Sequence, residues 1–476
     1  MKRVYFTLTL MSLFGGLNAF AQSYTTIDGV KYGLMKDGQC VVIGDDGAKG
    51  DITFENEVEI DGGKHTVTGV CGFGNYKEVT GHENGFSENT NITGITFEEG
   101  SQIKWIGDHA FKNCSSLKTI NNVPAGLTDI NEWCFESTAL ESVDLSKTNV
   151  TIMKDGVFFN NKSLTSIQLP NKLENFWDNA FNGCTALNNI DMPSTVKGIY
   201  NSVFEGCTSL SNVTWNEGCT TLGNHVFKNC PLAAVTFPKT LGSIGEWAFE
   251  GTKLETVDLS NTQITRLPKG CFYNCQQLSD VKLPIALTDI GECAFYKSAI
   301  ASITFPSSLQ KIDAWAFQFT QLTNVVIPTK TGHIGDGAFS DNDNSQLSIC
   351  YEDFFGERYN NLLINPYCLK MFKRRWYVLA YVPSMKIIRR FGLDRIQKIE
   401  TTDNTFKYPK DFSSEDYFHD FFGMVHDAEP LTIRLKAYRE KPNYRTYPFE
   451  YVSETIMCSN RLLQNWYFRN ETTFPQ

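Results

Sequence analysis

Phenylalanine recurs along the middle of the chain at a nearly constant spacing. From Phe111 to Phe339, eleven phenylalanines follow one another at intervals of 22 to 24 residues, and Phe86 precedes them by 25 residues. Between them, segments such as Leu254 to Leu259 follow the pattern Leu-x-x-Ile/Val-x-Leu/Phe. This period of two is expected of a short strand with one buried face. The repeat phenylalanines are Phe86, Phe111, Phe135, Phe158, Phe181, Phe204, Phe227, Phe249, Phe272, Phe295, Phe317 and Phe339.

A unit of about 23 residues cannot bury its Leu, Ile and Phe side chains alone. Stacking the units at the strand spacing of about 4.8 Å buries these side chains against one another as continuous ladders. We therefore predict a mainly β fold, a repeat solenoid with a parallel sheet along one face. Proline ends many of these strands because it cannot donate to the ladder of hydrogen bonds. Examples are Pro170, Pro193, Pro238, Pro284, Pro306 and Pro328.

Most of the 14 cysteines keep step with the repeat. We interpret them as small buried residues of the ladders, although a disulfide bond between stacked neighbours is an alternative. Their spacing matches neither a Cys-x-x-Cys pair nor a zinc site with histidine. Two, Cys134 and Cys271, directly precede a repeat phenylalanine. Five lie three residues after one: Cys114, Cys184, Cys207, Cys230 and Cys275.

The unit Ile-Gly-x-x-Ala-Phe-x-x-Cys-x-x-Leu-x-x-Ile-x-Leu-Pro, well represented at residues 106–114, resembles the BspA-type leucine-rich repeat family of bacterial surface proteins. The resemblance covers residues 86–345 and implies a leucine-rich-repeat solenoid. It also implies adhesion or host-protein binding and brings no catalytic residues. Residues 22–85 look like the β-rich N-terminal cap usual in that family.

Outward strand positions of the solenoid carry small polar and some acidic side chains. We expect them to contact a protein or glycan partner, although solvent-facing strands often have the same composition. By contrast, Trp133, Trp247 and Trp315 are expected to pack at the turns. The candidate partner-binding residues are Ser142, Asp144, Ser166, Gln168, Asn189, Asp191, Thr256, Asp258, Ser302 and Thr304.

The composition changes after Phe339. Residues 347–476 hold 19 Lys+Arg against 16 Asp+Glu, so the net charge of -10 belongs to the preceding part of the chain. From Arg358 to Lys398 there are ten basic residues and one acidic residue, Asp394. Aromatic residues alternate with this charge in residues 373–381. The stretch is either a solvated basic face or a site for an anion or nucleic acid.

Three motifs in this region, at residues 365–370, 375–378 and 388–396, resemble the WYL domain. The resemblance covers residues 347–427, with Val378 in place of the name-giving Leu, and implies an SH3-like small β-barrel. It also implies a ligand-sensing site for a nucleotide or single-stranded nucleic acid. For Trp376 and Tyr377, barrel core is the equal alternative. The candidate ligand-binding residues are Arg375, Trp376, Tyr377, Arg389 and Arg395.

Residues 428–476 resemble the start of the extension that often follows WYL domains. The helix-turn-helix DNA reader usual before that domain does not appear in this sequence, which puts direct transcriptional regulation in doubt.

The N-terminus has the three parts of an export signal. Lys2 and Arg3 are basic, residues 4–17 are mostly apolar, and residues 19–21 form the small-x-small sequence Ala-Phe-Ala. Residues 1–21 are therefore predicted to be a signal peptide of a secreted or cell-surface protein.

Motifs of catalytic chemistry are missing from the sequence. It has no His-Glu-x-x-His, no Gly-x-x-x-x-Gly-Lys-Ser/Thr and no Gly-x-Ser-x-Gly. We expect a non-enzymatic binding protein with no cofactor, no metal and no transmembrane segment in the mature chain. The alternative is a cytoplasmic nucleotide or nucleic-acid sensor of the WYL type, with the signal peptide misread.

Overall fold

The chain divides into two compact units, Met1–Asn342 and Asp343–Gln476, which are described separately. At strand positions 6, 7, 345, 368–372, 375, 376, 401, 403, 405, 431–433 and 456–458, the backbone alone is described. The computed structural model describes residues 6–7, 23–35, 38–73, 85–215, 217–322, 325–339, 345–372, 375–406, 409, 412, 417, 431–433 and 456–458.

The first unit begins with a β-rich cap, as expected. Neighbouring strands pair in the order β1, β2, β3, β4, β7, and β6 pairs with β7. The cap strands are β1 (Phe6–Thr7), β2 (Tyr24–Ile27), β3 (Val30–Leu34), β4 (Cys40–Asp45), β5 (Gly50–Phe54), β6 (Glu57–Ile60) and β7 (Gly63–Val70). Apart from β1, the expected signal peptide lies outside the described residues.

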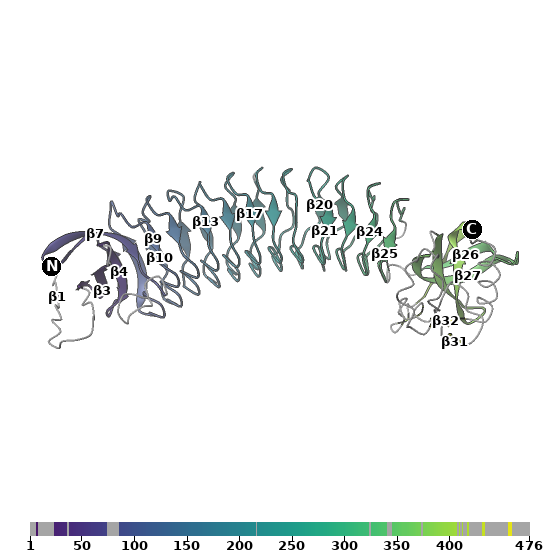
Figure 1. Ribbon diagram of the computed structural model, residues 1–476, viewed down its shortest axis with the longest axis horizontal. Coiled ribbons are helices and arrows are strands. Elements are labelled where there is room, and N and C mark those ends of the chain that lie inside the picture. Colours follow the sequence, from purple (N-terminus) through teal and green to yellow (C-terminus); the bar gives the residue numbers. More distant parts are fainter. Residues whose placement is uncertain are drawn as a thin grey trace, which may run out of the picture. The chain divides into compact units, whose positions relative to one another are not determined.

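The cap continues into the solenoid without a break in pairing (Figure 1). β7 pairs in parallel with β9 (Trp105–Ile106), and β5 pairs in parallel with β8 (Ile92–Phe97). The cap strands β5 and β7 therefore each offer an edge for parallel pairing where the first repeat begins. The repeats extend the sheets to which these two strands belong.

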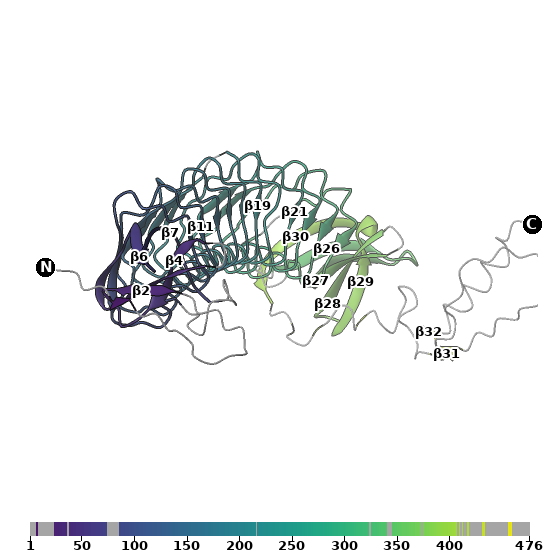
Figure 2. The same ribbon diagram turned by 60° about the vertical axis from the view of Figure 1, so that its left-hand side comes forward.

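Most solenoid turns contribute short strands to one or both of two parallel series (Figure 2). The first series comes from the Leu-x-x-Ile-x-Leu segments and was expected. It comprises β10 (Thr119–Asn121), β12 (Ser142–Asp144), β14 (Ser166–Gln168), β16 (Asn189–Asp191), β18 (Asn212–Thr214), β20 (Thr256–Asp258) and β22 (Asp280–Lys282).

The strands of the second series come before the repeat phenylalanines. The sequence pattern did not predict them as strands distinct from the following turn. These strands are only two residues long, too short to show a period of two. They are β9, β11 (Asp129–Ile130), β13 (Ile152–Met153), β15 (Asn175–Phe176), β17 (Gly198–Ile199), β19 (Thr221–Leu222), β21 (Arg266–Leu267), β23 (Asp289–Ile290), β24 (Lys311–Ile312) and β25 (His333–Ile334).

The repeat phenylalanines form one unbroken stack through the solenoid. Each ring from Phe86 to Phe339 lies on the next, with ring centroids 5.2 to 5.6 Å apart and interplanar angles between 2° and 23°. From Phe86 to Phe317 these side chains are at most 2% exposed. The predicted ladder is confirmed, and its large rings fill the centre of each of these turns.

The slot three residues after each repeat phenylalanine holds a buried polar group. The thiols of Cys114, Cys184, Cys207, Cys230 and Cys275 each donate to the carbonyl of the preceding repeat phenylalanine, at 3.0 to 3.2 Å. In another turn Asn161 Nδ2 donates to the Phe135 carbonyl at 2.7 Å. These five cysteines are free thiols. In these six turns the slot thus supplies a hydrogen-bond donor to the turn before, which Cys and Asn can both provide. The hydroxyls of Thr252 and Thr320, in the same slot, donate instead to the phenylalanine carbonyl of their own turn.

Two positions in each turn from Phe111 to Phe317 have a positive φ angle, two residues before and two residues after the repeat phenylalanine. The later position is Asn, Ser or Gly in every turn from Phe111 to Phe272. Tryptophan occupies the earlier position in three turns, and a Cβ on Gly156 would lie 2.1 Å from the ring of Trp133. A Cβ on Gly270 would meet Trp247 at the same distance. These two tryptophans therefore pack at the turns as expected.

The second unit contains a five-stranded antiparallel sheet in the order β29-β28-β27-β26-β30. Its core includes Ile349, Ile364, Val378 and Phe391, so Val378 occupies a core position. The expected small β domain is confirmed. Its strands are β26 (Ser345–Glu352), β27 (Arg358–Phe372), β28 (Arg375–Val382), β29 (Ile387–Gly392) and β30 (Ile396–Thr405), with a 3-10 helix η1 (Leu393–Arg395) before β30. Of residues 428–476, only the paired strands β31 (Leu431–Ile433) and β32 (Ile456–Cys458) are described.

Candidate binding sites

The ten outward residues predicted to meet a partner, here called the strand face, are exposed on the solenoid. Eight of them flank a central inward-facing residue in β12, β14, β16 and β20. Parallel register aligns Ser142 with Ser166 and Asp144 with Gln168. Ser302 and Thr304 are exposed but lie outside a described strand. The fold thus presents polar groups in rows, as the alternation predicted.

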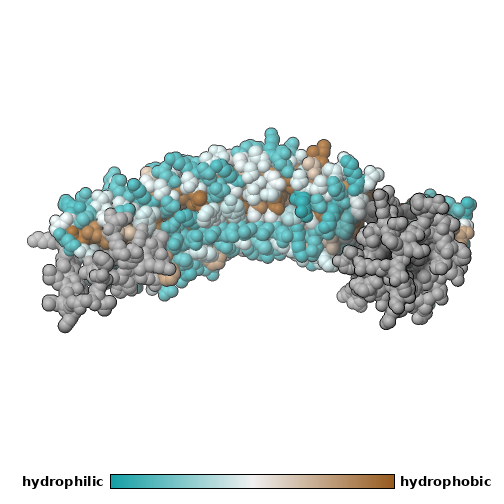
Figure 3. Space-filling view, viewed as in Figure 1, coloured by the Kyte–Doolittle hydropathy of each residue, from teal (hydrophilic) through white to brown (hydrophobic). Residues whose placement is uncertain are grey.

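Hydrogen bonds favour the charged form of two carboxylates on the strand face, Asp144 and Asp258. A hydrogen bond from Ser146 lowers the pKa of Asp144, and one from Ser260 lowers the pKa of Asp258. Lys282 Nζ also lies 3.1 Å from Asp258 Oδ2, so this second charge is partly neutralised. Figure 3 shows that the visible surface of the solenoid is mostly hydrophilic, with separate hydrophobic spots.

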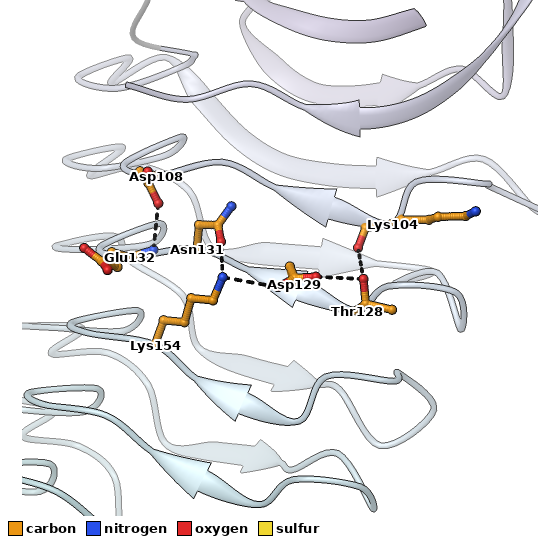
Figure 4. A network of polar contacts seen from close by, with 7 residues as sticks. All are labelled: Lys104, Asp108, Thr128, Asp129, Asn131, Glu132 and Lys154. Atoms are coloured by element: carbon orange, nitrogen blue, oxygen red, sulfur yellow. Dashed lines mark hydrogen bonds and ion pairs between the residues drawn. The ribbon is translucent and has the colours of Figure 1, made fainter. Parts of the chain in front are cut away.

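A polar network joins three turns near the cap (Figure 4). Lys154 Nζ donates to Asn131 Oδ1 and, at 3.1 Å, to Asp129 Oδ1. Asp108 Oδ1 accepts the backbone N–H of Glu132 at 3.2 Å. The network stabilises the stacking of these turns.

Acidic side chains occupy the slot three residues before the repeat phenylalanine in four successive turns. Burial raises the pKa of Glu132, and the neighbouring carboxylates of Asp155 and Asp108 raise it further. Burial and the neighbouring Asp178 raise the pKa of Asp155. This acidic row comprises Asp108, Glu132, Asp155 and Asp178. Within the described residues, no group of three or more His, Cys, Asp or Glu side chains could hold a metal ion.

In the second unit, Arg389 lies against the hairpin turn Asp353–Glu357 that joins β26 to β27. Its guanidinium donates to Asp353 Oδ2 at 3.3 Å, and these side chains are only 25% and 10% exposed. The same group lies 4.7 Å from the ring centroid of Tyr359 and 5.8 Å from that of Phe391. The charge of Arg389 is therefore neutralised by Asp353, and its guanidinium lies beside two aromatic rings.

Arg395 reaches the same hairpin turn from η1. Its guanidinium lies 5.1 Å from the ring centroid of Phe354, which is 70% exposed. The adjacent Phe355 is 80% exposed. The structure thus brings Arg389 and Arg395 to one turn, as the proposed site requires.

The other three predicted ligand-binding residues lie on β28. For Arg375 and Trp376 the backbone pairs with the end of β27, and their side chains are outside the described part. Tyr377 is half-buried and pairs with Gly392, whereas Arg389 pairs with Ala380. Positions 377 and 380 differ by an odd number, so Tyr377 and Arg389 point to opposite faces of the sheet. The structure does not bring Tyr377 together with Arg389.

Sequence reasoning missed the hairpin turn itself. Asp353 Oδ1 accepts the backbone N–H groups of Phe355 and Glu357, both at 2.9 Å, and Gly356 has a φ of 83°. The signal was the sequence Asp-Phe-Phe-Gly at 353–356, in which Asp and Gly are typical turn residues. In the part of the chain that the structure describes, no helix is long and apolar enough to cross a membrane.

Comparison with known protein families gives two matches, one to the repeats and one to part of the second unit. A BspA type leucine-rich repeat region matches residues 82–211, 197–320 and 244–354, which together exceed half of the chain. A WYL domain matches residues 342–401. A search of curated proteins found no match.

Among solved structures, the chain is similar to a leucine-rich repeat protein from Bacteroides ovatus, at 23% identity and a TM-score of 0.49. That match covers 66% of this chain and 91% of the other. A leucine-rich cell surface protein from Faecalibacterium prausnitzii matches at 24% identity and a TM-score of 0.39, covering 67% and 92%. The T. pallidum leucine-rich repeat protein matches at 24% identity and a TM-score of 0.36, covering 42% and 86%. On the extent of the repeat match, the chain belongs to the BspA-type leucine-rich repeat family.

Proposed function

We propose that the chain is a non-enzymatic binding protein, secreted or held at the cell surface, which recognises a protein or glycan through the strand face. The observation that carries this proposal is the row of exposed polar side chains on in-register parallel strands. A rigid stacked scaffold fixes such groups in advance, which reduces the entropy lost on binding. The motifs for common catalytic chemistry are missing from the sequence.

The location is tested on whole cells that express the full chain. We expect an added protease to degrade the protein while a cytoplasmic marker stays intact. N-terminal sequencing of the mature protein should begin at Gln22. A chain that keeps Met1 and resists the protease until the cells are lysed would refute export.

Recognition is tested by applying the purified chain to arrays of extracellular proteins and of glycans. We expect a hit whose affinity falls in the double variant Asn189→Lys/Asp191→Lys, because these exposed positions flank the buried Ile190. The matched control is Lys172→Asn, at an exposed site outside the strands. If the double variant and the control bind the partner with equal affinity, β16 takes no part in recognition.

A second candidate function is sensing of a nucleotide or single-stranded nucleic acid by the second unit. It is favoured by Arg389 and Arg395, which contact one hairpin turn together with aromatic rings. The Asp353 carboxylate weighs against it because it already neutralises Arg389. The test is salt-dependent binding of a short single-stranded oligonucleotide to the full chain. Arg389→Ala/Arg395→Ala should abolish this binding, and no binding by the wild-type chain would end the proposal.

A further inference from the structure

Aromatic side chains of four successive turns touch one another on the turn segments between the two strand series. Trp247 contacts Tyr273 with ring centroids 5.2 Å apart, Tyr273 stacks on Tyr296 at 4.8 Å, and Tyr296 meets Phe319 at 5.4 Å. Lys297 Nζ lies 5.5 Å from the ring centroid of Tyr296 and 5.8 Å from that of Phe319. We name these five residues the aromatic strip. It is separate from the strand face.

The aromatic strip departs from a rule that the turns from Phe111 to Phe272 follow. Lys297 and Phe319 lie two residues after a repeat phenylalanine, at φ angles of 59° and 58°. The turns from Phe111 to Phe272 use Asn, Ser or Gly there, because a left-handed backbone disfavours larger side chains. Glu88, after Phe86 at the cap end, is a separate exception with a φ of 66°. Two adjacent turns thus keep bulky residues where folding favours small ones, and Phe319 is 43% exposed. Strain of this kind at the surface points to a role in binding.

The slot directly after the repeat phenylalanine shows the same departure. Elsewhere this slot holds two ion pairs, Lys112 with Glu136 at 3.0 Å and Lys228 with Glu250 at 3.1 Å. One aromatic residue, Phe159, also occupies it outside the aromatic strip, and its ring meets only that of Trp133 among the described aromatic contacts. In the aromatic strip it holds Tyr273 and Tyr296. In these two neighbouring turns, aromatic rings therefore take the place of the ion pairs that link other neighbouring turns.

The chemistry of the aromatic strip selects one kind of partner. Tyr273 and Tyr296 are nearly parallel, with an interplanar angle of 4°, so they cover each other's faces. Trp247 covers Gly270 with one face. Ring faces for stacking on a sugar are thus largely occupied, and the rings offer edges and phenol groups. Lys297 is exposed and makes ring contacts but no ion pair within the described residues.

We propose that the aromatic strip is a docking surface for a polypeptide segment that carries apolar side chains beside an Asp or Glu. The apolar groups pack on the edges of the rings, and the carboxylate pairs with Lys297. Trp, Tyr and a cation in one patch match the side chains that dominate protein interfaces. The peptide's carboxylate would also pair with Lys297, which has no acidic partner among the described residues of the solenoid.

The test uses the full chain and a displayed library of random twelve-residue peptides as the probe. We expect enriched peptides to combine Asp or Glu with apolar residues. A synthetic peptide of the enriched sequence should bind the double variant Lys297→Asn/Phe319→Asn at least about 10-fold more weakly than the wild type. Asparagine suits the left-handed backbone at both positions, so the variant should keep its thermal transition.

The control is Phe159→Gln, which removes an aromatic side chain from the slot that Tyr273 and Tyr296 occupy, in a turn outside the aromatic strip. Its peptide affinity should equal that of the wild type. Three results would each overturn the proposal. They are a selection with no enriched sequence, equal binding by the double variant, and binding that is unchanged when the peptide's Asp and Glu are replaced by Asn and Gln.

Discussion

In six turns, the residue three positions after the repeat phenylalanine donates a side-chain hydrogen bond to a buried carbonyl of the turn before. This bond joins neighbouring turns within the core, where polar groups need hydrogen-bond partners. Cys207 Sγ donates to the Phe181 carbonyl at 3.2 Å, and Asn161 and Cys184 fill the slot in the same way elsewhere. Sequence spacing identified the cysteines as small buried residues. It did not reveal that they donate, because the acceptor belongs to the turn before.

Replacing Cys207 separates packing from hydrogen bonding. Cys207→Ser keeps the side-chain donor, whereas in Cys207→Ala the Phe181 carbonyl retains only the backbone N–H of Cys184, 3.1 Å away. We expect the alanine variant to lose about 0.5–1.5 kcal/mol of unfolding free energy, more than the serine variant loses. Urea denaturation of both variants measures the difference. Equal losses would mean that the slot needs volume alone.

The acidic row should limit stability at neutral pH. The pKa of Asp155 is raised in the folded state, so its stabilising contribution is present at low pH and disappears as pH rises through that pKa. Asparagine already fills this slot in later turns, where Asn201 Oδ1 accepts the backbone N–H of Asn224 at 2.9 Å. Asp155→Asn should therefore raise the melting temperature at pH 7 and change it little at pH 4. A melting temperature that falls at pH 7 would contradict the expected repulsion from Asp178.

Among the elements, the solenoid turn is the part of the fold that sequence predicts best. Its hydrophobic pattern, its phenylalanine and its outward polar positions all lie within one unit of the chain. What sequence missed are features that cross units, such as the ring stack from Trp247 to Phe319 and the two-residue strands of the second series. These features depend on which neighbours stacking brings together.

The phenylalanine stack makes the middle turns sensitive to truncation. Phe204 is 0% exposed and stacks on Phe181 and Phe227, with ring centroids 5.5 Å away in both directions. Phe204→Ala should cost about 3–5 kcal/mol, because it opens a cavity and removes both ring contacts. Phe204→Leu retains most of the volume and should cost clearly less. The measurement is the denaturation curve of each variant. Coincident curves would refute a contribution of the Phe204 ring and its volume to the free energy of unfolding.

The hairpin turn of the second unit depends on one carboxylate. Asp353 accepts two backbone N–H groups of the turn and pairs with Arg389. Asp353→Ala removes three hydrogen bonds and leaves Arg389 without this partner, so we expect a loss of about 1.5–3 kcal/mol or more. Asp353→Asn keeps the turn acceptor and loses the charge, and it should fall between the wild type and the alanine variant. A hydrogen–deuterium exchange experiment should show faster exchange at Phe355 and Glu357 in the alanine variant.

At the scale of the whole molecule, sequence separated the two units but placed the site of the second only in part. Charge and composition change after Phe339, and the units divide after Asn342. Arg389 and Arg395 were predicted to work together, and they do meet one turn. Tyr377 was grouped with them by position along the motif, yet the pleat of β28 directs it to the opposite face. A motif read along the chain does not show on which face a side chain lies unless the strand register is known.

Each unit buries its own hydrophobic core, so we expect two separate unfolding transitions in calorimetry of the full chain. The first unit is built around the phenylalanine stack, and the second around a cluster that includes Ile349, Val378 and Phe391. Phe204→Ala should lower one transition and Asp353→Ala the other. Each variant should leave the second transition within error of the wild type, because its substitution lies in one core. A single transition that both substitutions lower would show that the two cores unfold as one cooperative unit.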